Sequence, residues 1–190
     1  MTPLRQTILE DLYAKAEWNY ERSDRRALVK TLATDGTAAM ILYRLMQWSA
    51  RRRWSIAASL FNKLNGIFNN CIIGRDADFG ARFVLIHATG VVINGSVRGG
   101  SDVRIEHQVT IGAERRQAPV IGDNVFIGAG AKILGPVIVG DDVRVGANAV
   151  VVRDVPAHCT VVGIPAQVVR RRTPFLCDTA EDAPALAVRH

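Results

Sequence analysis

A period of six residues runs through the second half of the chain, and few folds are compatible with it. Counting in steps of six from residue 73 to residue 157 reaches fifteen positions, and thirteen of them are Ile, Leu, Val or Phe. This period fits neither an α-helix nor a strand of a flat sheet, but it fits a short strand and a turn, repeated. Three such hexads close one triangular coil, and stacked coils bury their apolar positions against each other. We therefore expect a parallel β-helix of about five coils over residues 71–169.

The same count predicts which side chains stack in the interior. With three hexads in a coil, every eighteenth residue lies above its counterpart. The two predicted columns are Ile73, Val91, Val109, Ile127 and Val145, and Leu85, Val103, Ile121 and Val139.

Residues 1–70 lack this period and are rich in helix-forming residues. In the stretch TILEDLYAKAEW, Ile8, Leu12 and Ala16 follow one another at helical spacing. We therefore expect a mainly β protein whose β-helix is preceded by a small α-helical region, residues 1–70. A basic and then flexible tail is expected over residues 170–190.

Charge and cysteine content limit the partners and the compartment. The formal net charge is +6, and residues 41–70 carry five basic residues and no acidic one. The basic, aromatic and amphipathic segment 51–68 is suited to a peripheral membrane contact, with packing against its own domain as the alternative. No nucleic-acid partner is expected. Three cysteines without metal-ligand spacing indicate no metal site and a cytoplasmic protein, with the inner membrane surface as the alternative location.

Several motifs within the hexads carry a family resemblance. The stretches IHATGVVI, IGDNVFIGAGAKILG, VGDDVRVGANAVVVRDVP and VVGIPAQVV resemble the hexapeptide-repeat acyltransferases, and within them the serine acetyltransferase branch. The resemblance covers residues 71–169. It implies that the β-helix is left-handed, that acetyl-CoA is the co-substrate, and that the protein is a homotrimer with active sites in the clefts between subunits.

His87 is the expected catalytic residue. It lies two residues after the apolar position Leu85, so its side chain is expected to point outward. In the family that the chain resembles, the histidine of this stretch is the general base, which takes the proton from the acceptor hydroxyl as that oxygen attacks the thioester. Imidazole suits this task because it titrates near neutral pH. A structural turn histidine is the alternative.

Three departures from the serine-specific members of the family concern the acceptor site. The aspartate that those enzymes carry fifteen residues before the histidine is Ile72 here, the aspartate directly before it is Ile86, and their loop histidine is Ala118. The acid that orients His87 must therefore come from elsewhere. We prefer Glu106 as this second catalytic residue, because it lies about one coil later in an outward position. A backbone carbonyl is the alternative partner for His87, and an ordinary surface acid is the alternative for Glu106.

Further acceptor contacts are expected one coil later and in the irregular loop ERRQAP. His107 falls on an inward, usually small position of the hexad, which favours a partly buried structural histidine, with a substrate contact as the alternative. Arg115 replaces an apolar hexad residue and is expected to leave the column for the loop. The expected substrate-binding residues are His107, Arg115, Arg116 and Gln117.

The resemblance also implies where acetyl-CoA binds. In the family the pantetheine arm lies along the C-terminal coils beside small residues, which here are Gly112, Ala113, Ala129 and Ala147. Basic side chains on the same half of the chain are the expected partners of the CoA phosphates. These side chains are Lys132, Arg144 and Arg170, with ordinary solvation as the alternative.

The departures favour a sugar over serine as the acetyl acceptor. The ammonium group of serine would lack an acid beside Ile72 and Ile86, whereas a sugar is neutral. In this respect the chain is most similar to the exopolysaccharide O-acetyltransferases, which also have a short helical N-terminal region. We expect direct acetyl transfer to a sugar hydroxyl in exopolysaccharide biosynthesis, since no Cys or Ser lies in a nucleophile motif. L-serine is the alternative acceptor, and a non-catalytic trimeric scaffold is the alternative of another class.

Overall fold

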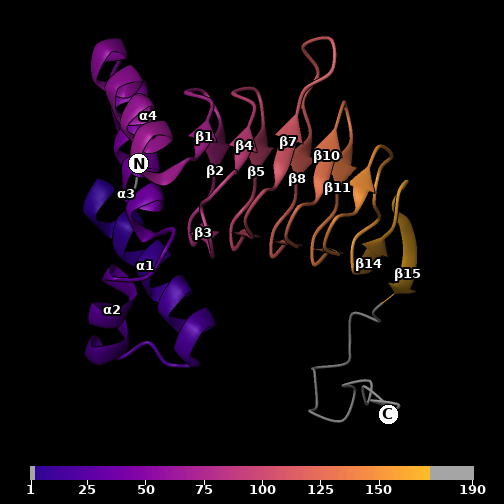
Figure 1. Cartoon of the computed structure of the whole chain (residues 1–190), viewed down its shortest axis with the longest axis horizontal. Helices are drawn as coiled ribbons and strands as arrows, with labels where there is room; N and C mark the ends of the chain where they lie inside the picture. Colours follow the sequence, from indigo (N-terminus) through magenta and orange to yellow (C-terminus); the bar gives the residue numbers. More distant parts are fainter. Residues whose placement is uncertain (1–2, 172–190) are drawn as a thin grey trace.

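The computed structural model describes residues 3–171, and in it a bundle of helices lies at one end of an elongated stack of short strands (Figure 1). The helices are α1 (Leu4–Tyr20), α2 (Arg25–Leu32), α3 (Thr37–Arg51) and α4 (Ser55–Asn69). None of the helices within residues 3–171 combines the length and the apolar character that a membrane crossing requires.

The strands form three sheets, which the chain visits in turn in each coil. Sheet A contains β1 (Ile72–Ile73), β4 (Val92–Ile93), β7 (Thr110–Gly112), β10 (Lys132–Leu134) and β13 (Val150–Val151). Sheet B contains β2 (Asp78–Phe79), β5 (Arg98–Gly99), β8 (Val120–Ile121) and β11 (Ile138–Val139). Sheet C contains β3 (Val84–Leu85), β6 (Arg104–Ile105), β9 (Phe126–Ile127), β12 (Arg144–Val145), β14 (Cys159–Val162) and β15 (Gln167–Arg171).

This arrangement confirms the predicted mainly β fold, a parallel β-helix that follows a few helices. All neighbouring strands in the three sheets are parallel except β15, which is antiparallel to β14. Arg170 and Arg171, which we assigned to the tail, belong to β15, and residues 172–190 of that expected tail lie outside the described residues.

The predicted stacking columns were wrong in the first coils, where two insertions shift the register, but the predicted pairs Ile127–Val145 and Ile121–Val139 are confirmed. In sheet A, Ile73 lies opposite Ile93, and Ile93 lies opposite Ile111. The step from Leu85 to Ile93 is eight residues, two more than a hexad, and the step from Ile111 to Ile121 is ten, four more. The two insertions add up to six, so a count by sixes returns to phase after both. Between them, the count selects Val91, Val97, Val103 and Val109, which are also buried but lie two residues too early.

Each insertion forms an irregular corner of the β-helix. The first contains His87 and joins sheet C to sheet A. The second joins sheet A to sheet B, and it projects from the body between β7 and β8 (Figure 1). At its tip Glu114 and Gln117 exchange two backbone hydrogen bonds of 2.8 Å around Arg115 and Arg116, both of which have positive φ. That geometry is a tight two-residue hairpin, and Arg115 leaves the apolar column as expected.

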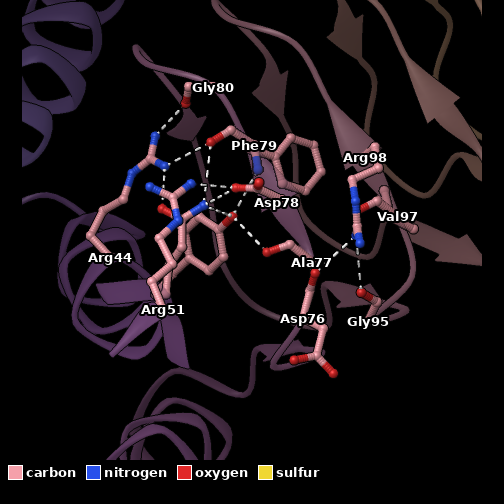
Figure 2. Close-up of polar contacts among 12 residues, drawn as sticks. Arg44, Arg51, Asp76, Ala77, Asp78, Phe79, Gly80, Gly95, Val97 and Arg98 are labelled. Carbon is pink, nitrogen blue, oxygen red and sulfur yellow. Dashed lines mark hydrogen bonds and ion pairs between the residues drawn. The ribbon is translucent and has the colours of Figure 1, made fainter. Parts of the chain in front are cut away.

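A buried arginine joins the helices to the first coil. Arg44 of α3 is 2% exposed, and its Nε lies 2.6 Å from Oδ2 of Asp11 on α1. Its Nη1 and Nη2 donate to the backbone of the first coil, at Phe79 O (2.9 Å) and Gly80 O (2.5 Å), as Figure 2 shows. Nη1 also donates to Gln47 Oε1, and Nη2 also donates to Asp11 Oδ1. Asp11 in turn accepts a hydrogen bond from the backbone N–H of Phe83. The position of α3 on the β-helix is therefore fixed by charged hydrogen bonds as well as by apolar packing.

The exposed face of α4 agrees with the amphipathic pattern seen in the sequence. Ile56 and Phe68 are 88% and 76% exposed, and Leu60 and Ile67 are also exposed. Arg52, Arg53 and Lys63 are exposed near this face, whereas Arg44 is buried and contributes nothing to a basic surface. A peripheral membrane contact through residues 51–68 stays a prediction.

Candidate active site

His87 is exposed at the first irregular corner and contacts an acid from the helical region. Its Nδ1 lies 3.1 Å from Oδ2 of Asp35, a residue of the turn between α2 and α3. The two side chains are 53% and 51% exposed, so a small molecule can reach them. An ionised carboxylate only accepts hydrogen bonds, so this contact requires that Nδ1 carries a hydrogen. In the neutral imidazole, Nε2 is then the unprotonated nitrogen that can accept a proton.

The acid that contacts His87 in the structure is Asp35, whereas we expected Glu106. Leu85 lies opposite Ile105 in sheet C, so the counterpart of His87 one coil later is His107, and Glu106 is the counterpart of Ile86. Glu106 contacts His107 instead, with 3.5 Å between Oε2 and Nδ1. The expectation assumed a coil of eighteen residues, which brings Glu106, nineteen residues after His87, close to it, whereas the step across this corner is twenty.

His107 lies beside His87 and not in the interior. Its side chain is 45% exposed, and the two imidazole rings are 5.9 Å apart at an angle of 75°. The inward position predicted for His107 was wrong because the count by sixes is two residues out of phase here. The structure thus brings His87, His107, Glu106 and Asp35 together at one corner.

Small residues continue from these histidines along the same edge of the β-helix. The register pairs Ile105 with Ile127 and Ile127 with Val145, so the residues two positions later form a column. The backbone confirms the contact between coils, since Gly130 N donates to His107 O and Asn148 N donates to Ala129 O. The column consists of His87, His107, Ala129 and Ala147.

Two predicted cofactor-binding cations lie on either side of this column. Lys132 is on sheet A, where its Nζ donates to Gln108 O at 2.5 Å. Arg144 is on sheet C, with its guanidinium 5.4 Å from the centre of the Phe126 ring. Arg170 is farther along, on β15 opposite Thr160.

The other predicted contacts lie at a different edge. Gly112 and Ala113 lead into the hairpin between sheets A and B, which carries Arg115, Arg116 and Gln117. His87 is at the edge between sheets C and A. Within one chain the hairpin residues are therefore not brought to His87.

The three positions where the chain departs from serine-specific enzymes lie in different environments. Ile86 is 8% exposed and packs with Ala14 of α1, so it does not line the site. Ile72 is 52% exposed on the outer face of sheet A. Ala118 is partly buried against the core beside the hairpin. The acids of this site come from Asp35 and Glu106 instead.

Sequence reasoning missed two residues of this site, Asp35 and Lys15. Lys15 lies on α1 and is fully buried, and its ammonium donates to the carbonyl oxygens of Asp35 and Leu85. Burial lowers the pKa of Lys15 to about 8, against the opposing attraction of the Asp35 and Glu106 carboxylates. The available signal was the spacing of Asp11 and Lys15, two charged residues one helical turn apart on the face of α1 that also carries Leu12.

Among residues 3–171 no group of three or more His, Cys, Asp or Glu side chains is arranged to hold a metal ion. Cys71 is buried, and burial raises the pKa of its thiol to about 12, which makes it a poor nucleophile. The side chains of His87, Asp35, His107 and Glu106, which meet at the corner, are imidazoles and carboxylates.

Comparison with known proteins agrees with this geometry. Residues 118–153 match the family model described as bacterial transferase hexapeptide (six repeats). The chain is 42% identical over 147 residues to a serine acetyltransferase of Mycobacterium tuberculosis, covering 73% of this chain and 62% of that protein. It is 34% identical to a serine acetyltransferase of Helicobacter pylori, covering 88% of this chain and 95% of that protein.

A solved structure gives the same result. The crystal structure of serine acetyltransferase in complex with coenzyme A from Brucella abortus strain S19 superposes with a TM-score of 0.80 at 28% identity, covering 90% of this chain and 70% of that one. The names of these relatives overturn our expectation that the exopolysaccharide O-acetyltransferases are the nearest branch. An acid from another part of the chain, Asp35, lies beside His87. The chain belongs to the serine acetyltransferase family of hexapeptide-repeat transferases.

Proposed function

We propose that the protein transfers an acetyl group from acetyl-CoA directly to the hydroxyl of L-serine, with His87 as the general base. The observation that carries the proposal is the contact of His87 Nδ1 with Asp35, which leaves Nε2 free to accept a proton. The relatives that match the chain are named serine acetyltransferases. Because the chain spans only 62% of the M. tuberculosis relative, its activity is inferred from the site as well as from the likeness.

The proposed step needs no covalent enzyme intermediate. Nε2 of His87 takes the hydroxyl proton while the oxygen attacks the thioester carbonyl. The carbon–sulfur bond then breaks, and the imidazolium returns the proton to the CoA sulfur, giving O-acetylserine and CoA. The Asp35 carboxylate stabilises the imidazolium between these transfers.

The column of small residues supports a site for the pantetheine arm. Neighbouring coils are about 4.8 Å apart, so Ala129 and Ala147 continue away from the imidazoles in regular steps. Methyl side chains leave room for a linear chain against the backbone. Lys132 and Arg144, on the two flanks, place positive charge beside the column, which suits the phosphates of CoA.

Two carboxylates at the corner support an acceptor that carries an ammonium group. Our expectation of a sugar rested on the absence of acids at Ile72 and Ile86. Asp35 and Glu106 supply acids near His87 from other positions, so the ammonium group of serine is not left unpaired.

A cation for the carboxylate of serine is proposed to come from a second copy of the chain. The hairpin with Arg115 and Arg116 lies at a different edge from His87, so it reaches a histidine only in another subunit. A ring of three copies places one hairpin at each corner site. We therefore keep the homotrimer as part of this proposal, and light scattering that finds a monomer contradicts it.

The decisive experiment measures CoA release with acetyl-CoA and a panel of acceptors. We expect turnover with L-serine and background rates with L-alanine, which lacks the hydroxyl, and with neutral sugars. His87→Ala should lower kcat by about 10²–10⁴-fold while acetyl-CoA still binds. Turnover with a sugar and not with serine overturns the acceptor, and activity of His87→Ala within a few-fold of wild type overturns the role of His87.

The placement of acetyl-CoA has its own test. Ala129→Trp should abolish acetyl-CoA binding in titration calorimetry, because the indole fills the column beside His107. Ala157→Trp is the matched control, since Ala157 is exposed at the edge between sheets B and C. Unchanged affinity in Ala129→Trp shows that the arm binds elsewhere.

A further inference from the structure

A lysine that is fully buried is unusual, because an ammonium group loses its hydration when it is buried. Lys15 has no exposed surface. Its Nζ donates to Leu85 O at 2.6 Å, to Ile86 O at 3.3 Å, and to the backbone oxygen of Asp35. Three donors thus meet three carbonyl oxygens, which satisfies the ammonium group completely.

These three acceptors belong to the two segments that form the His87–Asp35 pair. Leu85 and Ile86 are the two residues directly before His87 in the chain. Asp35 supplies the carboxylate, and its own backbone oxygen is one of the acceptors. Lys15 therefore ties the backbone on both sides of the 3.1 Å contact, although it touches neither side chain of the pair.

The close approach of the two segments also depends on Gly36. This residue has a φ of +77°, and a Cβ at this position would lie 2.4 Å from Leu85 O and 2.9 Å from Lys15 Nζ. Any other residue would push the turn between α2 and α3 away from the end of β3. The ammonium group and the glycine together hold this turn against the corner.

We propose that Lys15 is a positioning residue of the active site, which holds the turn between α2 and α3 against the end of β3 and so keeps the Asp35 carboxylate on Nδ1 of His87. This inference rests on the proposed function of His87 as a base. The charged groups that act on the lysine are the carboxylates of Asp35 and Glu106. Within residues 3–171 no carboxylate forms an ion pair with its Nζ, so backbone oxygens alone fix its place.

A double-mutant cycle tests this inference. Lys15→Met should lower kcat for serine acetylation by about 10–100-fold, which is the size expected when a contact that orients a catalytic group is lost. The KM for acetyl-CoA should stay within about twofold of the wild-type value. In the Asp35→Asn background the same change should cost less than about threefold, since the carboxylate it positions is already absent. Lys30→Met, which removes an exposed lysine of α2, is the matched control. An equal loss in both backgrounds overturns the proposal.

A second variant disturbs the contact between the turn and the end of β3 without removing the charge of Lys15. Gly36→Ala should reproduce the kcat loss of Lys15→Met, because the methyl group separates the turn from Leu85 O. Gly66→Ala on α4 is its control, since a Cβ there meets nothing within 4 Å. Full activity in Gly36→Ala contradicts the proposal. The Gly36→Ala variant also tests the proposal if Lys15→Met fails to fold.

A spectroscopic readout separates this inference from the proposed function. Nitrogen NMR of the His87 imidazole reports which ring nitrogen carries the hydrogen, whether or not the enzyme turns over serine. We expect a protonated Nδ1 in wild type and Lys30→Met, and a mixture of tautomers in Lys15→Met and Asp35→Asn. A wild-type protein without acetyltransferase activity refutes the proposed function alone. An unchanged Nδ1 signal in Lys15→Met refutes the role of Lys15.

Discussion

Two buried cations join the helical region to the first coil, and they do so in different ways. Arg44 of α3 has an acidic partner, Asp11, and also reaches the carbonyl oxygens of Phe79 and Gly80 (Figure 2). Lys15 of α1 donates to carbonyl oxygens only. The charge of Arg44 is neutralised by the Asp11 carboxylate, whereas the charge of Lys15 is stabilised only by the dipoles of backbone carbonyl groups.

The difference decides whether each cation titrates. Burial alone would lower the pKa of Arg44, but the hydrogen bond and charge of Asp11 outweigh it and raise the pKa, so Arg44 stays charged at any ordinary pH. Burial lowers the pKa of Lys15 to about 8. The guanidinium therefore serves as a permanent link, whereas the ammonium beside the His87–Asp35 pair has a pKa of about 8 and loses its proton at mildly alkaline pH.

The largest expected effect is on the permanent link. Arg44→Met should lower the free energy of unfolding by about 3–5 kcal/mol, because it leaves the Asp11 carboxylate buried without its partner. Chemical denaturation measures this change. Arg51→Met is the control, since the Arg51–Asp78 pair is 48% exposed on both sides and exposed pairs contribute about 0–1 kcal/mol. Equal losses in the two variants would remove the distinction between buried and exposed links.

The second expected effect is a pH dependence that only the lysine produces. Between pH 8 and 10.5, the ordinary pKa of lysine, the unfolded chain keeps the Lys15 proton and the folded chain releases it. Raising the pH through this window therefore favours the folded state. The free energy of unfolding of wild type should rise relative to Lys15→Met by about 3 kcal/mol over these 2.5 units. Denaturation at each pH checks this, and a flat difference shows that Lys15 does not titrate there.

The smallest expected effect separates stability from the geometry of the site. Asp24 caps α2, and its side chain accepts from Ala27 N at 2.8 Å. Asp24→Ala should cost about 1 kcal/mol of stability and leave kcat for serine unchanged, because neither cation is touched. A large loss of kcat here would mean that any loosening of the helices disturbs His87, and the special role of Lys15 would then be unsupported.

The fold was predictable because the same apolar position recurs in almost every hexad of the repeat. Thirteen apolar positions out of fifteen were enough to predict the β-helix, and a single displaced residue could not hide it. The register was not predictable in the same way. Its two irregular corners cancel in a count by sixes, so strand pairings are needed to reveal them, such as Leu85 with Ile105 for the first and Gly99 with Ile121 for the second.

The site was predictable only where a motif marks it. His87 stands in a recognisable stretch, and its outward position two residues after Leu85 agrees with the structure. Asp35 lies 52 residues away on a turn, and its contact depends on how α2 and α3 dock on the first coil. Without knowledge of that docking, we chose Glu106 because it lies about one coil after His87 in an outward position. No repeating pattern in the sequence indicates that the turn between α2 and α3 lies beside a corner of the β-helix.

The acceptors of the two buried cations also bear on how the chain is made. Residues 1–70 leave the ribosome before the first coil exists, yet Arg44 takes its backbone partners from that coil, and Lys15 takes two of its three from it. Until those carbonyl oxygens have been synthesised, two charged side chains lie on helix faces that later become interior. Until the corner that carries His87 has emerged, Lys15 therefore lacks two of its three carbonyl partners.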